Sequence, residues 1–185
     1  MKYILSILMI VGLTLSSYSK SKEVGENIDV THYEIHLNEI NVADRIIDAT
    51  TIITLKTLTS IDGIELELKS LDVTSVTSDD AIINNFSQNG DVLSVTFGNT
   101  VTANTTISLT VNYGGTTFNE NWGGIHWSND YVYNLGVGFD SQPHNLGKTW
   151  FPCVDNFTDK ASFDLYITFP DNMLSSCGGL LSATT

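Results

Sequence analysis

The sequence is poor in basic residues and in cysteine. Only 8 Lys and Arg stand against 21 Asp and Glu in 185 residues, which gives a formal net charge of -13. A chain this acidic repels phosphate backbones, so nucleic acid is not expected as a partner. Two cysteines are too few for a scaffold built on disulfides. We expect Cys153 and Cys177 to be free thiols, and a disulfide between them in an oxidising compartment is the alternative.

Helical periodicity is also missing beyond the N-terminal segment, and there is no internal repeat or low-complexity linker. Candidate strands instead follow one another along the chain, at 32–40, 46–58, 82–86, 92–97 and 105–113. Apolar and polar residues alternate in the longer ones, which is typical of half-buried strands, and Asn89-Gly90 is a hairpin turn signal. The pattern predicts an all-β fold, an antiparallel β-sandwich in which sequential hairpins supply most pairings.

The N-terminus has the features of a secretory signal peptide. Lys2 gives a positive start, Ile4–Leu15 is a short apolar run, and Ser17-Tyr18-Ser19 is a small-x-small cleavage site. The run is too short to span a bilayer comfortably, although a retained anchor is the alternative. We expect a signal peptide at 1–19 and a short leader at 20–29. The product is then secreted or periplasmic, with no membrane contact after cleavage.

The most distinctive segment is Gly147–Pro170. Residues 150–153, Trp-Phe-Pro-Cys, form a rigid apolar cluster because proline fixes its own φ and lacks an N–H donor. The following stretch, Ala161–Phe169, alternates with a period of two and predicts a half-buried strand. Its apolar side carries Phe163, Leu165, Ile167 and Phe169.

This segment resembles the FPC-x-D-E-P-x-x-K-A-x-F signature of the aminopeptidase N and leukotriene A hydrolase-like zinc metallopeptidases, the gluzincins. Asn156 and Phe157 replace the Glu and Pro of that signature. The resemblance implies that residues 30–185 are the saddle-like N-terminal β-sandwich domain of such an enzyme. The apolar, strand-like end at 180–185 implies a domain truncated at its C-terminus, before its last hairpin and the catalytic domain. The matching positions are Phe151, Pro152, Cys153, Asp155, Lys160, Ala161 and Phe163.

The resemblance also implies substrate-binding residues. In this family a Gln or Glu upstream of the FPC motif helps to hold the free amino group of the peptide. A one-residue insertion within 145–149 brings Gln142 to that position, and its amide oxygen can accept a hydrogen bond from an ammonium. Asp140 would accept more strongly because it is charged. The alternative, that both are ordinary polar loop residues, stays open at this stage.

The zinc-binding signature of these enzymes, H-E-x-x-H on a helix, is missing from the sequence. The nearest string, 32–36, has the Glu in the wrong place and lies on a candidate strand, where His32, Glu34 and His36 leave a metal site as a minor alternative. We therefore expect no catalytic residues, metal ligands or cofactor in this chain. Zinc is expected in the missing catalytic domain of the same parent chain, and peptide is the expected substrate.

The favoured interpretation is the substrate-entrance and docking domain of an exported zinc aminopeptidase. A second interpretation rests on residues 119–133, which look like a loop with large aromatic rings rather than a strand. Trp122, Trp127, Tyr131 and Tyr133 there suggest an exported binding or adhesion module that stacks sugars or peptides on its rings.

Overall fold

The structure, a computed structural model, describes residues 23–129 and 131–184, so the predicted signal peptide lies outside the described residues. The described part is all-β, as predicted, and its only helical turn is the 3-10 turn η1 at Gly147–Thr149. It contains no helix that is long and apolar enough to cross a membrane. The strands are β1 Ile28–Asn41, β2 Ile46–Thr57, β3 Ile61–Glu67, β4 Asp72–Thr77, β5 Ile83–Asn89, β6 Val92–Val101, β7 Thr106–Thr116, β8 Asn119–Glu120, β9 Gly123–Trp127, β10 Val132–Leu135 and β11 Ser162–Ile167.

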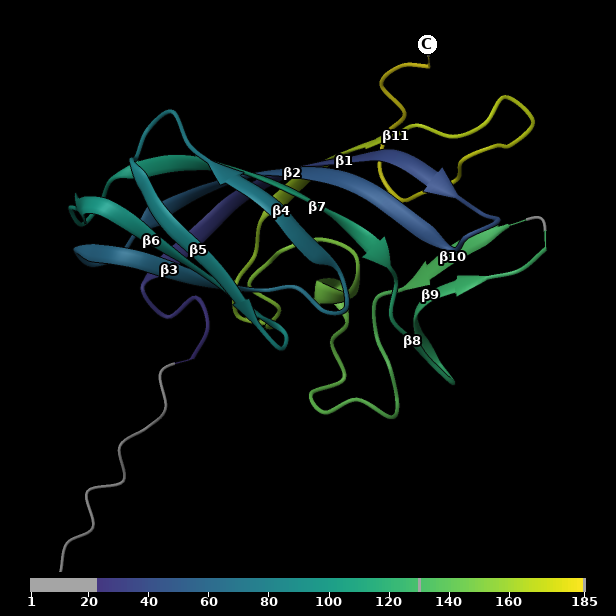
Figure 1. Cartoon of the computed structure of the whole chain (residues 1–185), viewed down its shortest axis with the longest axis horizontal. Helices are drawn as coiled ribbons and strands as arrows, with labels where there is room; N and C mark the ends of the chain where they lie inside the picture. Colours follow the sequence, from purple (N-terminus) through teal and green to yellow (C-terminus); the bar gives the residue numbers. More distant parts are fainter. Residues whose placement is uncertain (1–22, 130, 185) are drawn as a thin grey trace, which may run out of the picture.

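Two sheets form the sandwich (Figure 1). Sheet A has the order β11-β1-β2-β7-β4, and sheet B has the order β3-β6-β5. Alternate residues of each strand point into the space between the sheets, because successive side chains of a strand face opposite ways. The fully buried ones make the core, among them Ile35, Ile53, Leu55, Leu66, Leu93, Ile107 and Leu109.

Sequential hairpins account for only part of the pairing. They join β1 to β2, β5 to β6, β8 to β9 and β9 to β10. The other pairings are not sequential: β7 pairs with both β2 and β4, and β3 pairs with β6. The last strand, β11, runs parallel to β1, with His32 opposite Ser162 and Leu37 opposite Ile167. A parallel pair requires a long connection, and here the connection is almost the whole domain.

The aromatic segment predicted to be a loop is instead a small third sheet, β10-β9-β8. The backbone comes very close to its neighbours here, so two glycines are needed. Gly123 and Gly124 have positive φ values of 143° and 77°, and a Cβ on Gly123 would lie 2.7 Å from the Cα of Gly138. The small sheet, called sheet C below, lies at one end of the sandwich (Figure 1).

The strand predicted in Gly147–Pro170 forms, but its apolar side is less buried than expected. Leu165 packs against the core, whereas Phe163 is 54% exposed and Phe169 is 37% exposed. The reason is position: β11 is the edge strand of a five-stranded sheet that faces a three-stranded one. Its outer edge therefore carries exposed rings.

A matched pair of leucines tests this core. Leu55 on β2 is 0% exposed, and Leu58 just beyond the strand is 50% exposed. We expect Leu55→Ala to lower the free energy of unfolding by about 3 kcal/mol, because it loses apolar burial and leaves a cavity. Leu58→Ala should change it by less than about 0.5 kcal/mol. Denaturant melts of both variants measure this, and equal effects would contradict the described core.

Candidate functional site

Residues 150–155 connect the two sheets of the sandwich. The backbone of Cys153 pairs with Glu67 at the end of β3, with N···O distances of 2.8 and 3.0 Å. On the other side, the N–H of Val154 donates to the Tyr33 hydroxyl of β1 at 3.1 Å. The segment is thus bonded to sheet B through its backbone and to sheet A through a buried tyrosine.

A second tyrosine completes this junction. The Tyr113 hydroxyl of β7 donates to the carbonyl of Trp150 at 3.0 Å and also contacts the Thr51 hydroxyl at 3.0 Å. Phe151 meets the ring of Tyr33 edge-on, with centroids 5.1 Å apart. Burial raises the pKa of both tyrosines, so both stay protonated in solution. The apolar cluster predicted for residues 150–153 is confirmed, because Cys153 is buried and Trp150 and Phe151 pack against the core.

Both cysteines are free thiols, as predicted. Cys153 is buried inside the junction, and this burial raises the pKa of its thiol well above the ordinary value. It is therefore an inert core thiol. Cys177 is exposed.

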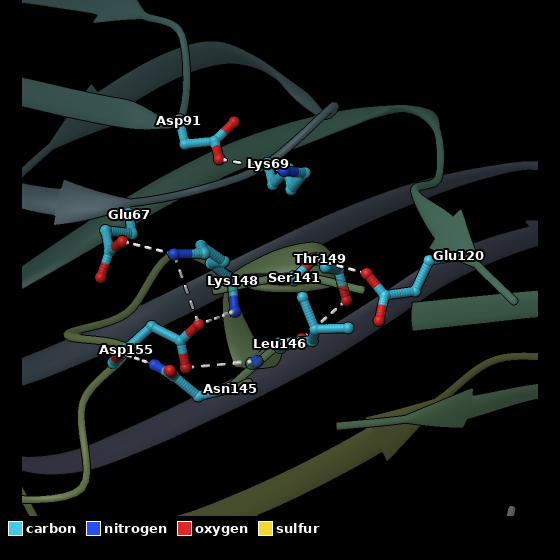
Figure 2. Close-up of polar contacts among 11 residues, drawn as sticks. Glu67, Lys69, Asp91, Glu120, Ser141, Asn145, Leu146, Lys148, Thr149 and Asp155 are labelled. Carbon is cyan, nitrogen blue, oxygen red and sulfur yellow. Dashed lines mark hydrogen bonds and ion pairs between the residues drawn. The ribbon is translucent and has the colours of Figure 1, made fainter. Parts of the chain in front are cut away.

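A buried ion cluster holds the segment just before the junction (Figure 2). Lys148 Nζ lies 2.6 Å from Glu67 Oε1 and 3.9 Å from Asp155 Oδ2. The Asp155 carboxylate also accepts hydrogen bonds from the N–H groups of Gly147 and Lys148, and its carbonyl accepts one from the Asn145 amide. Burial alone would lower the pKa of Lys148, but the hydrogen bond and charge of Glu67, with the charge of Asp155, raise it overall.

The structure places both predicted substrate residues, Asp140 and Gln142, on one exposed loop, residues 136–145. The loop leads from β10 directly into the ion cluster. Its base is closed by contacts between its two arms. These are Leu146 N–H to the Gly136 carbonyl at 2.9 Å, Gly138 N–H to the His144 carbonyl at 2.8 Å, and a β-bridge between Val137 and Asn145.

The hydrogen bonds of His144 fix the orientation of the Gln142 amide. His144 Nδ1 lies 2.8 Å from the carbonyl of Gly138, and a carbonyl only accepts, so Nδ1 carries the proton. In a singly protonated ring, Nε2 is then an acceptor for the Gln142 Nε2–H, at 3.1 Å. The amide oxygen of Gln142 is left without a partner among residues 23–129 and 131–184.

Sequence reasoning missed a third residue at this loop, Glu120 of β8. One oxygen of its carboxylate accepts the N–H of Asp140 at 2.9 Å. The other accepts the Ser141 hydroxyl at 2.5 Å (Figure 2). The hydrogen bond from Ser141 is the largest cause that lowers the pKa of Glu120. No sequence pattern marks Glu120, because it contacts residues about twenty positions away.

The string at 32–36 does not form a metal site in the described part of the chain. Glu34 Oε1 lies 2.7 Å from His36 Nε2, whereas His32 Nε2 is directed at Asp164, at 3.7 Å, on the neighbouring β11. More broadly, the described residues contain no group of three His, Cys, Asp or Glu side chains suited to a metal ion.

The four rings proposed as one stacking platform are divided between separate places. The Trp127 indole donates to Thr117 and packs against the core. Trp122 stacks on Phe139 at 6.2 Å, while Tyr131 and Tyr133 group with His126 on the β9–β10 hairpin. This division argues against a single sugar-binding platform.

A matched pair of lysines tests the ion cluster. The side chains of Lys148 and Glu67 are 11% and 20% exposed, whereas those of Lys69 and Asp91 are 25% and 41% exposed. We expect Lys148→Met to lower the free energy of unfolding by about 2 kcal/mol, because it leaves a mostly buried carboxylate unpaired. Lys69→Met should cost less than about 1 kcal/mol.

The pH dependence of the loss of unfolding free energy in Lys148→Met gives a second readout. Because folding raises the pKa of Lys148, its contribution is complete below the unfolded pKa and is lost as the pH rises through the folded pKa. The difference in the free energy of unfolding between wild type and Lys148→Met should therefore be constant near neutral pH and become smaller at strongly alkaline pH. A gap that instead widened there would contradict the pairing.

Comparisons with known proteins agree with this architecture. The family model of the peptidase M1 N-terminal domain matches residues 29–181. An M1 zinc metallopeptidase mutant from Deinococcus radiodurans, solved with a Tyr-Ser-Ala substrate, has 22% identity and a TM-score of 0.63 over 77% of this chain and 32% of that chain. The same organism's M1 zinc metallopeptidase in another structure has 21% identity and a TM-score of 0.63, over 76% of this chain and 32% of that one. No curated protein matches the sequence.

At 21% and 22% sequence identity, the similarity to the solved structures establishes only a shared fold. This chain spans about a third of the length of those proteins. The family match is broader, because it covers nearly all of the described residues, including the junction at Cys153 and the loop with Asp140 and Gln142. The chain therefore belongs to the peptidase M1 family, as its N-terminal domain.

Proposed function

We propose that the chain is the substrate-entrance and docking domain of an exported, zinc-dependent aminopeptidase. In this proposal residues 1–19 direct export to the periplasm or the medium, and residues 30–185 form the domain. The zinc ion and its H-E-x-x-H helix belong to a catalytic domain of the same parent chain. The role of this domain is to bind and orient the free amino terminus of a peptide, not to cleave it.

One observation carries the binding role: the loop at 136–145 presents two hydrogen-bond acceptors that the domain leaves unused. Gln142 has an amide oxygen without a partner, because its nitrogen faces His144. Asp140 accepts from Asn121 with one oxygen, Oδ2, at 3.1 Å, and its other oxygen has no partner among the described residues. A substrate ammonium has three donors and needs acceptors of this kind.

The electrostatics of this end of the domain support a cationic ligand. The sequence from 70 to 147 contains no Lys or Arg at all, so no basic side chain from that half of the chain competes for the two acceptors. Two carboxylates, those of Asp140 and Glu120, lie at the loop, and their negative charge raises the concentration of a positively charged ligand near it.

Exposed rings at the same end support docking to another domain. Trp122 is 52% exposed, Tyr131 59%, Tyr133 45% and Phe139 71%. These rings form two groups, Trp122 with Phe139 and Tyr131 with Tyr133, and exposed apolar groups of this kind are typical of surfaces that pack against a partner. The occupant that we propose is the catalytic domain of the parent chain, which would enclose the acceptors of the loop in a pocket.

Amine binding by the 15N-labelled chain tests the proposal. We expect phenylalaninamide to shift the NMR signals of residues 138–144, with a dissociation constant on the order of 1 mM or weaker, because only part of the pocket is present. N-acetylphenylalaninamide, which lacks the charge, should not do so. Asp140→Asn should weaken binding by at least about threefold and Gln142→Ala by less, because hydrogen bonds to ionised groups are stronger.

The matched control is Asp79→Asn, which removes one exposed charge from the connection between β4 and β5. It should leave binding of the amine unchanged. Equal binding of the free and the acetylated amide would contradict a role for this loop in holding an amino terminus, and so would a loss of binding in the control alone.

A further inference from the structure

The tip of the loop, residues 139–143, lacks the backbone support that closes its base. Among the described residues, a single backbone–backbone hydrogen bond joins the tip to the rest of the domain. It runs from the Phe139 N–H to the Trp122 carbonyl, at 3.3 Å. The predicted substrate residues are on this tip. Something other than the backbone must therefore hold Asp140 and Gln142 in place.

Two side chains give the tip hydrogen bonds: the Asn121 amide, which donates to Asp140 Oδ2 at 3.1 Å, and the carboxylate of Glu120. Its two oxygens take two different donors from the tip, the Asp140 N–H at 2.9 Å and the Ser141 hydroxyl at 2.5 Å. Hydrogen bonds to an ionised acceptor are shorter and stronger than neutral ones. The lowered pKa of Glu120 agrees with a carboxylate that remains charged while it holds the loop.

The loop is also shaped to accept this carboxylate. A Cβ on Gly138 would collide with Glu120 Oε1, and would lie 2.6 Å from a methyl group of Leu146. Glycine thus allows the arm of the loop to approach the carboxylate closely. Figure 2 shows Glu120 facing Ser141, with the ion cluster of Lys148 farther to the left in the view.

We propose that Glu120 is the positioning residue of the amino-group site: it fixes the tip so that the free acceptors of Asp140 and Gln142 face the substrate. This inference rests on the proposed function of the loop. Both oxygens of Glu120 are directed at the loop, so we assign it the positioning role and assign ammonium binding to Asp140 and Gln142. Residues 139–143 are then ordered before substrate arrives, so binding does not have to order them.

Exchange and binding measured on the same labelled chain test the proposal. Glu120→Ala should speed hydrogen exchange of the Asp140 amide by about tenfold and weaken phenylalaninamide binding by at least about fivefold, with core amides unchanged. Glu120→Gln keeps an acceptor oxygen and should restore part of both losses. Glu39→Ala, which removes an exposed carboxylate from β1, is the matched control and should change neither.

A double-mutant cycle with Gly138→Ala isolates the contact. The added methyl group should loosen the tip when Glu120 is present and have a smaller effect when Glu120→Ala has already removed the carboxylate. Additive effects would overturn the proposed contact. Unchanged amine binding in Glu120→Ala would overturn the positioning role and leave the proposed function intact. A wild-type chain that does not distinguish free from acetylated amide would overturn the proposed function, and this inference with it.

Discussion

The double attachment of residues 150–155 is the constraint on which the rest of the structure depends. Cys153 is paired by its backbone to β3 of one sheet, and the neighbouring residues are bonded to Tyr33 and Tyr113 of the other. The polar groups of an irregular segment that is buried between sheets must be satisfied, because each unpaired one costs more than a typical hydrogen bond contributes. Two tyrosine hydroxyls and one strand edge meet that requirement here.

The loop at 136–145 is held in position by this junction. Asp155, at the end of the junction, holds the backbone at 147 and 148, and Lys148 returns to Glu67 beside the Cys153 pairing. The loop at 136–145 begins at the small sheet and ends at this ion cluster, so both of its ends are fixed. Glu120 then holds its tip. An acceptor that is fixed in this way recognises a ligand without first having to be ordered.

Local patterns in the sequence predicted most of the strands and the apolar cluster at 150–153, because alternation and proline geometry are properties of neighbouring residues. They also placed Asp140 and Gln142 together on one loop. They did not predict the parallel pairing of β11 with β1 or the third sheet. Those features depend on residues far apart in the chain, or on the close backbone approach at Gly123.

The same limit applies to the site. Lys148 and Glu67 are 81 positions apart, and no local pattern pairs them. Glu120 lies in a stretch dominated by rings and glycine, where one carboxylate carries no signal of its own. The tautomer of His144, which decides that the Gln142 oxygen is free, follows only from its distance to the Gly138 carbonyl. The residues that orient the predicted acceptors therefore became visible only in three dimensions.

The most direct measurement for the central claim is the DNA sequence of the source gene beyond codon 185. If the chain is the substrate-entrance domain of a zinc aminopeptidase, the open reading frame continues and encodes H-E-x-x-H in a helical stretch, followed by a further glutamate ligand. An in-frame stop codon directly after Thr185, or a continuation without a zinc-binding motif, would contradict the account.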